Sequence, residues 1–260
     1  MWIYLCPFRG MCQVMDRIIK ITLSIFIIVL VTFVALVSYN GYVENAYRTS
    51  LTSSYSYSCT ITTDSPLANV TLFLPVPADT TGNSPVIAQL SAHEVSGVPD
   101  TWKTELYETG KSTMVKITTP SIIPPEGTSA KNPFTVTIYT NVSSGNLIDT
   151  RNPVENSPMF RPVQDVTATA CRNDQAPASG GQCSSYLTSL YANYQASPNA
   201  EVSVRSSLTG TNEWTIFEPK ENEYRTDIYL LMFGEQKGWT TVRGYVESGI
   251  GAYDAPSLHT

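Results

Sequence analysis

One apolar run constrains this chain more than any other feature. Residues 21–39 read ITLSIFIIVLVTFVALVSY and contain no charged side chain. As a helix that rises about 1.5 Å per residue, this run measures roughly 28 Å, close to the ~30 Å hydrocarbon core of a bilayer. No second run of this kind occurs in the 260 residues. We therefore expect one transmembrane helix over residues 18–39, in contact with the lipid bilayer, and a water-soluble fold for the residues that follow.

The charges on either side of this run predict its orientation. Arg9, Arg17 and Lys20 precede it, offset by Asp16 alone, whereas the first charge after it is Glu44. Because basic residues stay on the cytoplasmic side, we expect a cytoplasmic N-terminus and an extracellular body at the plasma membrane. A cleaved signal peptide is the alternative, but its apolar region is typically ~7–15 residues and ends in a small-x-small site. The longer run here favours an uncleaved signal anchor.

The first residues of the chain are unusual. Met15 opens MDRIIK, which is a conventional short basic lead-in to an anchor. We expect Met15 to be the true start and residues 1–14 to be an untranslated extension of the gene model. The alternative is that Cys6 and Cys12 are lipidation sites beside the membrane.

Composition predicts a mainly β body. The net charge of −6 argues against a nucleic-acid binder, which would present a basic patch. Thr, Val, Ile, Tyr and Phe, which suit a half-buried pleated surface, are plentiful. We expect a β-sandwich-like ectodomain, as one large sandwich or two successive ones. The predicted parts are a cytoplasmic segment 1–17, the anchor 18–39, a stalk 40–52, a first β unit 53–148, a linker 149–162 and a second β unit 163–255.

Alternation of apolar and polar residues predicts individual strands. One buried face is predicted for Val70, Leu72, Leu74 and Val76, and another for Phe134, Val136, Ile138 and Val142. Further strands are predicted at 87–95, 102–108, 113–119, 166–171, 201–208, 214–217, 224–233 and 239–246, the later ones forming a meander of hairpins. One helix is predicted between residues 184 and 198, where apolar residues recur at helical spacing: Leu187, Leu190, Tyr191 and Tyr194.

Three cysteines lie after the apolar run. Cys171 and Cys183 bracket a loop that contains Gly, Ser and Pro, and outside the membrane a disulfide between them can persist. Closing so short a loop contributes about 3 kcal/mol. A metal site needs more thiolates or histidines than this segment holds. Cys59 shares a face with Tyr57 and Ile61, which predicts a buried small hydrophobe, with a reactive thiol as the alternative.

Two sequons predict N-glycosylation. Asn69-Val70-Thr71 and Asn141-Val142-Ser143 both match N-x-S/T, and both asparagines fall on the polar faces of predicted strands. In a chain so rich in Asn, Ser and Thr, chance sequons are the competing interpretation.

The sequence offers no catalytic constellation. Of the two histidines, His259 is penultimate, and His93 begins HEVSG, which lacks the second His of a zinc-protease motif. We therefore predict no catalytic, cofactor-binding or metal-binding residues and no cofactor. A carboxylate pair for glycoside hydrolysis needs only closeness in space, and the sequence does not rank its candidates. These are Glu94, Asp100, Glu105, Glu213, Glu218 and Asp227.

Aromatic residues gather in the second half of the chain. They are Tyr186, Tyr191, Tyr194, Trp214, Tyr224, Tyr229, Trp239, Tyr245 and Tyr253. Such rings can form a carbohydrate-binding or peptide-binding surface. Packing in the core and in cross-strand pairs is the simpler interpretation, and we expect it for most of them.

These observations favour a non-catalytic role in binding, adhesion or assembly at the cell envelope, with an envelope protein or a glycan as partner. The alternatives are a surface glycan hydrolase and an accessory subunit of a membrane complex. The acidic, Lys-poor composition with sequons and one anchor is typical of archaeal cell-surface proteins, with a eukaryotic type II membrane protein as the alternative.

Overall fold

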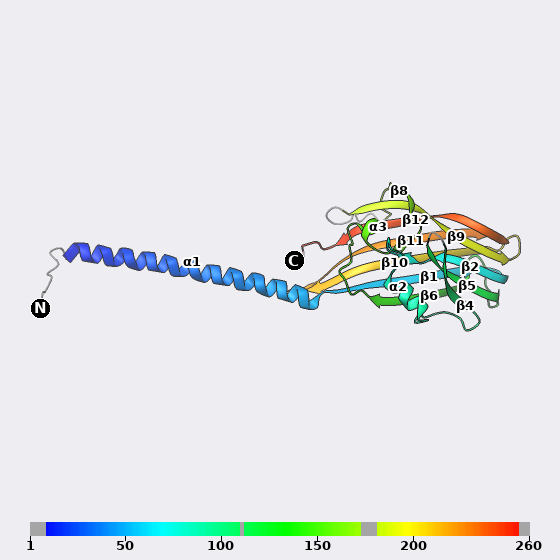
Figure 1. Ribbon diagram of the computed structural model, residues 1–260, viewed down its shortest axis with the longest axis horizontal. Helices are drawn as coiled ribbons and strands as arrows, with labels where there is room; N and C mark the ends of the chain where they lie inside the picture. Colours follow the sequence, from blue (N-terminus) through cyan, green and yellow to red (C-terminus); the bar gives the residue numbers. More distant parts are fainter. Residues whose placement is uncertain (1–8, 110–111, 173–180, 255–260) are drawn as a thin grey trace. The chain divides into compact units, whose positions relative to one another are not determined.

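The structure is a computed structural model that describes residues 9–109, 112–172 and 181–254. The chain divides into two compact units, one that contains the N-terminal helix and one that comprises Leu51–Ala255. The second unit, which we call the body, is mainly β, and its strands are labelled in Figure 1. Cys6 and His259 lie outside the described residues, and so do residues 1–8 of the predicted N-terminal extension.

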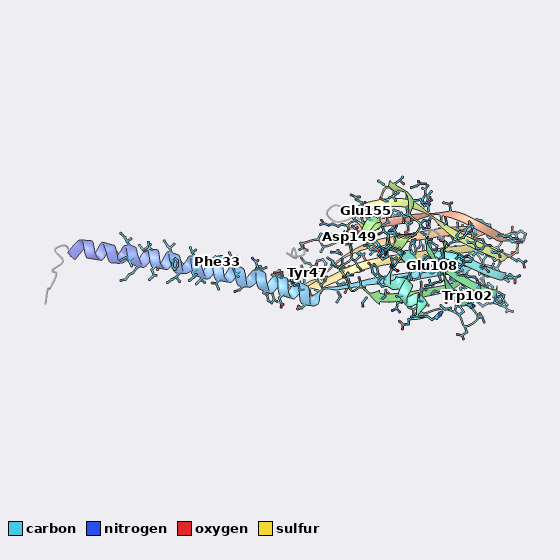
Figure 2. All side chains as sticks on the ribbon, in the orientation of Figure 1. Phe33, Tyr47, Trp102, Glu108, Asp149 and Glu155 are labelled. Atoms are coloured by element: carbon cyan, nitrogen blue, oxygen red, sulfur yellow. A yellow bond between two sulfur atoms is a disulfide. The ribbon has the colours of Figure 1, made fainter. Side chains whose placement is uncertain are left out.

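The first element, α1 (Arg9–Ser50), is a continuous helix. Its segment Arg17–Ser50 is long and apolar enough to cross a membrane. The apolar side chains are exposed on every side, with Phe26 64% and Ile27 49% exposed, and they project around Phe33 in Figure 2. The Ser24 hydroxyl donates to the Lys20 carbonyl at 2.8 Å, so its polar group is satisfied within the helix, as lipid requires. These properties suit a membrane anchor or a signal sequence.

The segment predicted as a stalk is helical over most of its length. Residues 40–50 continue α1, and the Arg48 guanidinium donates to the Glu44 carboxylate one turn away at 2.7 Å. Such a pair at i, i+4 supports a helix. The first strand begins at Thr52, within the last residues of the predicted stalk.

The body is built on one ten-stranded antiparallel sheet, which is curled (Figure 1). Its strands are β1 (Thr52–Thr63), β2 (Leu67–Pro75), β4 (Lys103–Glu108), β5 (Thr113–Ile122), β6 (Phe134–Ser143), β8 (Gln164–Ala168), β9 (Gln182–Gln195), β10 (Glu201–Thr215), β11 (Pro219–Phe233) and β12 (Gln236–Gly251). Their order is β4-β5-β2-β9-β12-β11-β10-β1-β6, and β8 pairs with β9. A second, two-stranded sheet joins β3 (Pro77–Ala78) to β7 (Met159–Phe160).

Strands from the two predicted β units are interleaved in this sheet. β1 lies between β6 and β10, and β2 lies between β5 and β9. The segment predicted as a linker holds α3 (Pro153–Asn156) and β7, whose Met159 and Phe160 are fully buried. The structure therefore follows the alternative of one large β unit, with residues 149–162 as a packed crossover.

Most predicted strands are present with the predicted faces. Val70, Leu72, Leu74 and Val76 are each at most 2% exposed. The hairpin β4–β5 and the meander β10–β11–β12 also occur, although β10 is one strand where the sequence predicts two, at 201–208 and 214–217. Period-two alternation was a sound guide wherever one face of a strand is buried.

The strand predicted at 87–95 is wrong, because this segment contains the helix α2 (Pro85–Ser91). Ser84 caps the helix, its hydroxyl accepting a hydrogen bond from the Ile87 amide at 3.1 Å, and Pro85 occupies the first turn. Val86 and Leu90, one turn apart, supply the buried face. A capping serine followed by proline is a helix start signal that outweighs local β propensity.

The helix predicted between residues 184 and 198 is also wrong, because this segment is the central strand β9. Buried and half-buried positions alternate along it, so Leu190 and Tyr194 face the core while Leu187 and Tyr191 face outward. The apparent helical spacing of Leu187, Leu190, Tyr191 and Tyr194 combines residues from both faces of the strand. Pairing with β12 on one side and with β2 and β8 on the other decides the conformation.

The core fills the inner face of the curled sheet, where two tyrosines cover glycines on adjacent strands. Tyr186 is paired with Gly244, and Tyr224 with Gly210. A Cβ on Gly244 would lie 2.2 Å from the Tyr186 ring, and one on Gly210 would lie 2.3 Å from the Tyr224 ring. A tyrosine ring packed over a glycine stabilises the sheet at that position, where the glycine has no side chain of its own.

The two edges of the sheet, β4 and β6, are linked by α2 and the chain that follows it. α2 contacts both edge strands. Ser96 forms an antiparallel bridge with Tyr139 of β6, at N···O distances of 2.9 and 3.0 Å. Gly97 lies so close to β6 that a Cβ would fall 2.0 Å from the Thr137 carbonyl oxygen. We call residues 93–102 the seam segment.

Candidate functional site

Four aromatic side chains from four strands meet on the outer face of the sheet: Tyr107 of β4, Phe73 of β2, Tyr191 of β9 and Trp239 of β12. We call this cluster the aromatic face. The ring centroids lie 5.1 Å apart for Phe73 and Tyr107, and 5.4 Å apart for both Phe73–Tyr191 and Tyr191–Trp239. Successive rings are steeply inclined, at 61° to 80°, which is the edge-to-face arrangement that aromatic quadrupoles favour.

The aromatic face is exposed at both of its ends. Trp239 is 56% exposed and Tyr107 is 50% exposed, while Phe73 and Tyr191 between them are half-buried. The neighbouring residues Leu72 and Leu190 point the other way, into the core, as strand alternation requires. The rings are therefore additional to the core of the body.

Strand register places charged residues in line with the rings. Phe73 is opposite Tyr191, and Tyr191 is opposite Trp239. In the other direction Phe73 is opposite Lys116, whose ammonium lies 6.0 Å from the Phe73 centroid, and Lys116 is opposite Glu105. The Glu105 carboxylate contacts Lys116 at 3.8 Å and Lys103 at 2.5 Å. The row thus ends in a charged group of two cations that share one anion, with a net charge of +1.

Short polar side chains border the rings. A second row of cross-strand pairs lies two residues away from the rings along the strands. In this row Thr118 is opposite Thr71, and Thr71 is opposite Asn193. On the opposite side of Trp239 and Tyr191, Thr241 is paired with Ser189. Hydroxyl and amide groups, which both donate and accept hydrogen bonds, therefore lie within one residue pair of the aromatic rings.

The aromatic face lies near one end of the sheet, and the chain enters the body at the other. Trp239 lies just after the β11–β12 turn. Phe233, the last residue of β11 before this turn, is paired with Glu201 of β10. The adjacent Val202 pairs with Thr63, the last residue of β1. β1 has 12 residues, or roughly 40 Å at about 3.3 Å each. The rings and the first residue of β1 are thus separated by nearly the length of that strand.

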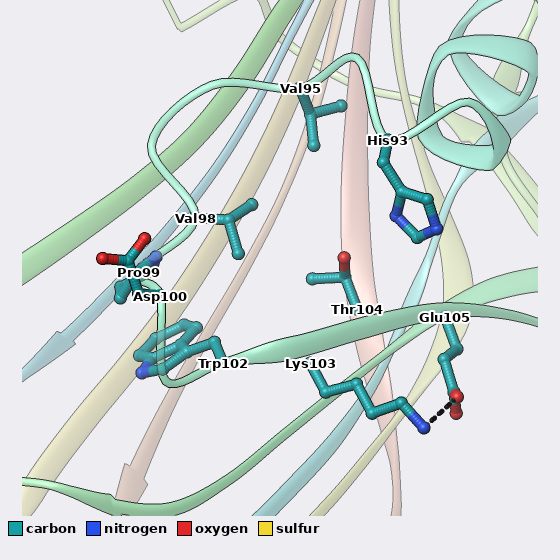
Figure 3. A pocket seen from close by; sticks show the side chains of 9 residues that line it. All are labelled: His93, Val95, Val98, Pro99, Asp100, Trp102, Lys103, Thr104 and Glu105. Atoms are coloured by element: carbon teal, nitrogen blue, oxygen red, sulfur yellow. Dashed lines mark ion pairs between the residues drawn. The ribbon is translucent and has the colours of Figure 1, made fainter.

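A pocket adjoins the aromatic face at the seam segment. Its volume is about 430 Å³, and His93, Val98, Trp102, Lys103 and Glu105 are among its lining residues (Figure 3). Glu105 and Lys103 belong to both the pocket and the charged end of the aromatic row. The hydrogen bond from Lys103 and the charges of Lys103 and Lys116 lower the pKa of Glu105.

The two candidate carboxylates that line the seam pocket do not form a catalytic pair. Only Asp100 and Glu105 of the six line the seam pocket, and Figure 3 shows them on opposite sides of it. A glycoside hydrolase needs one carboxyl that keeps its proton, whereas Glu105 is held as a carboxylate by its lysines. Asp227 instead forms a two-oxygen pair with Arg172, both at 3.1 Å.

A second pocket, of about 390 Å³, is lined by Asp79 and Arg161 among others. The Asp79 carboxylate accepts hydrogen bonds from the Thr81 amide, the Thr81 hydroxyl and the Asn83 amide, at 2.8, 2.6 and 3.1 Å. The Arg161 guanidinium donates to the carbonyls of Ala78 and Val154, at 2.9 and 3.3 Å. Both charged groups thus hold loops in place.

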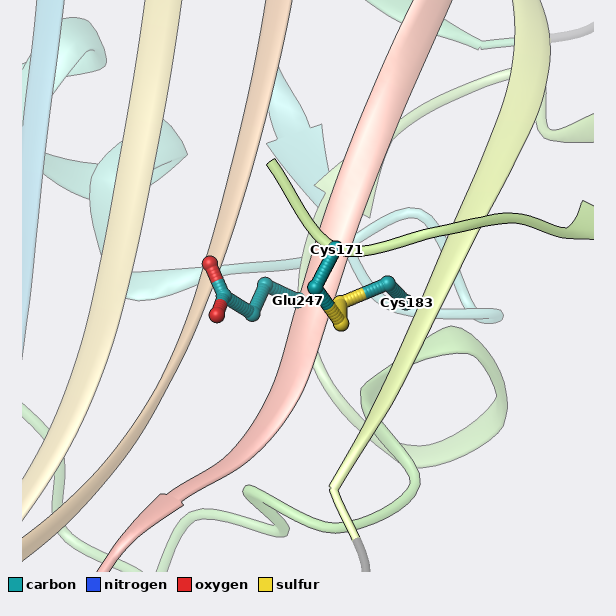
Figure 4. A group of neighbouring side chains, drawn as sticks. All are labelled: Cys171, Cys183 and Glu247. Carbon is teal, nitrogen blue, oxygen red and sulfur yellow. A yellow bond between two sulfur atoms is a disulfide. The ribbon is translucent and has the colours of Figure 1, made fainter. Parts of the chain in front are cut away.

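Cys171 and Cys183 form a disulfide, with Cα atoms 5.3 Å apart, and Glu247 lies beside it (Figure 4). The sulfurs and a Glu247 carboxylate oxygen lie within 4.8 Å of one another. Metal ligation by cysteine requires thiolates, which the disulfide removes. In the oxidised chain this cluster is a covalent link between β9 and the segment after β8.

Replacing both Cys171 and Cys183 by serine should destabilise the body by about 3 kcal/mol, because the short loop they close no longer restrains the unfolded chain. For a protein of this size, the melting temperature should fall by roughly 6–12 °C. Thermal unfolding of the full chain in mild detergent measures the shift. Reduced wild-type chain serves as the control and should match the variant; an unchanged melting temperature in both would contradict the prediction.

Cys59 is buried, as predicted. It is 1% exposed on the inner face of β1, and burial raises the pKa of its thiol to about 11. Since the thiolate is the reactive form, this residue packs as a small apolar side chain.

Both sequon asparagines are on exposed strand positions. Asn69 adopts a φ of 54° at an irregularity in the β2–β9 pairing, and its amide donates to the Gln195 side chain at 3.3 Å. Asn141 lies on the outer face of the edge strand β6. Glycosylation of either residue stays a prediction.

The aromatic residues of the second half of the chain divide between core and surface. Tyr186, Tyr194, Tyr224 and Trp214 are at most 2% exposed, whereas Trp239 is on the outer face. Sequence reasoning missed Phe73 and Tyr107, which come from the first half. Phe73 carried a signal: it stands at a polar-face position between the inward-pointing Leu72 and Leu74.

No protein-family model, curated protein or solved structure matches this chain. The function is therefore argued from the geometry of the body.

Proposed function

We propose that this chain is a single-pass cell-surface protein whose extracellular body binds a partner without catalysis, through the aromatic face. In this proposal α1 is an uncleaved anchor in the plasma membrane with a cytoplasmic N-terminus, and the curled sheet packs as a sandwich around one core. The observation that carries the proposal is a cluster of four aromatic rings, two of them exposed, at the end of the sheet remote from Leu51, where the chain enters the body.

The anchor is supported by the exposed apolar side chains of α1, since a helix that is apolar all round is stable in lipid and not in water. The extracellular position of the body is supported by the Cys171–Cys183 disulfide, which persists in oxidising compartments. The aromatic face lies at the end of the sheet remote from Leu51, so a partner that binds there would have room to approach.

Binding is supported by the residue types of the aromatic face. Tyrosine and tryptophan are enriched at interface centres because they bring large contact areas at a small cost in conformational entropy. Trp239 and Tyr107 each leave about half of the side chain in water, so a partner that covers them would bury apolar area that the folded body leaves exposed.

The test is binding of the full chain, held in nanodiscs, to envelope vesicles from the cells that express it. Replacing both Trp239 and Tyr107 by alanine should weaken binding by at least about 30-fold, the loss of one strong interface residue or more. Tyr139→Ala is the matched control, because Tyr139 is 49% exposed on the edge strand β6, outside the aromatic face. Equal binding by wild type and the double variant would show that the aromatic face is not the binding site.

A further inference from the structure

The arrangement of apolar and polar groups on the aromatic face restricts the chemistry of its partner. Sugar rings present a C–H face that packs on an aromatic ring and a rim of hydroxyls that both donate and accept hydrogen bonds. The aromatic face offers the same two elements in alternate rows: the rings of Phe73, Tyr191 and Trp239, then the hydroxyl and amide groups of Thr71 and Asn193.

The spacing of the aromatic row suits a chain of repeating units. The aligned strands place successive side chains about 4.8 Å apart, and the ring centroids follow this spacing at 5.4 Å. An extended sugar chain lying across the strands, along the row and not along any one strand, would meet the rings of Trp239, Tyr191 and Phe73 in turn and then Lys116.

The residues beside the row carry a net positive charge. Lys116 and Lys103 share the one Glu105 carboxylate, and Lys237 is opposite Asn193 in the second row. Acidic groups on a sugar chain would therefore be attracted to this site.

The seam pocket extends the row. Glu105 is both the last residue of the row and a wall of the pocket, and Trp102 and His93 also line this pocket (Figure 3). Its volume of about 430 Å³ is in the range of small-ligand sites. The pocket can accept the end of a chain that lies on the rings.

We infer that the partner of the aromatic face is a carbohydrate chain that runs across the strands from Trp239 to Glu105 and places its terminal sugar in the seam pocket. This inference rests on the proposed function and names the ligand class of the same site.

The deciding experiment treats the envelope vesicles before binding is measured with the full chain in nanodiscs. Mild periodate cleaves the vicinal diols of sugars and should reduce binding at least tenfold, whereas protease treatment of the vesicles should leave binding within about threefold. Binding that survives periodate but is lost after protease overturns the carbohydrate inference and leaves the proposed function standing. Binding that neither treatment reduces also overturns the inference. Absence of binding to untreated vesicles overturns both.

Two substitutions at one residue connect this result to the aromatic face. Trp239→Phe keeps a ring for the sugar and should bind untreated vesicles within about threefold of wild type, whereas Trp239→Ala should lose at least tenfold. Tyr139→Ala should behave as wild type, before and after periodate. Equal binding by Trp239→Phe and Trp239→Ala would exclude ring stacking and overturn the inference.

Discussion

Replacing Asn212 by alanine is expected to destabilise the body by about 3–5 kcal/mol, at the upper end for a single substitution. Its side chain is 2% exposed and forms hydrogen bonds through all of its polar positions. The amide donates to the Ile148 carbonyl at 2.9 Å and to the Asn222 side chain at 2.8 Å. The amide oxygen accepts from the Ser53 hydroxyl at 2.7 Å and from the Ile148 amide at 3.0 Å. Alanine would leave the Ser53 hydroxyl and the Ile148 amide and carbonyl without these bonds, at about 1–3 kcal/mol each before relaxation, whereas the Asn222 oxygen keeps its bond from the Thr150 hydroxyl.

The measurement is thermal unfolding of the full chain in mild detergent, where the melting temperature should fall by roughly 6–20 °C. Asn141→Ala is the matched control, since that asparagine is exposed on β6 and its loss should change stability by less than about 0.5 kcal/mol. A small effect at Asn212, comparable with that at Asn141, would mean that residues 146–158 are held to the sheet by other contacts.

The individual strands of this fold could be predicted from the sequence because one face of each strand is buried. Leu72 and Leu74 point into the core, as the alternation around them indicates. The helix predicted between residues 184 and 198 was wrong because the local spacing was ambiguous, whereas the strand predicted at 87–95 was wrong because Ser84 and Pro85 start a helix. Leu190 and Tyr191 read as neighbours on a helix face, and only the pairing of β9 with strands far away in the sequence separates them onto two faces.

The pairing of strands could not be predicted in the same way, and the candidate site depends on it. Phe73 and Trp239 are far apart in the chain and meet because β9 lies between β2 and β12. Each ring alone has an ordinary explanation in the sequence, as core or as a scattered surface residue. The cluster becomes visible only when the register brings the rings of four strands together.

The disulfide and the buried Cys59 thiol, in contrast, could be predicted from local sequence. Cys171 and Cys183 are close in the chain, so a short loop and a compartment argument were enough to pair them, and the structure joins them. Cys59 is buried at a position that alternation alone assigns to the inner face. Local information was sufficient in both cases.

Replacing Gly244 by alanine is expected to destabilise the body by about 2–3 kcal/mol, because the interior has no space for one additional methyl group. The new Cβ would lie 2.2, 2.5 and 2.6 Å from three atoms of the Tyr186 ring. That ring cannot move aside easily, since Tyr186 is 1% exposed and its hydroxyl is hydrogen-bonded to the Thr226 hydroxyl at 2.8 Å. The melting temperature should fall by roughly 4–12 °C.

A second glycine and a double variant make this prediction specific. A Cβ at Gly145 would meet nothing within 4 Å, so Gly145→Ala should leave the free energy of unfolding within about 0.5 kcal/mol of wild type. Tyr186→Ala alone should cost about 3–5 kcal/mol through the cavity it leaves. With that cavity present, Gly244→Ala has room for its methyl group, and the two changes together should cost at least about 1 kcal/mol less than their sum. Strict additivity would show that the tyrosine does not pack on the glycine, and that β9 and β12 are held in register by their backbone ladder alone.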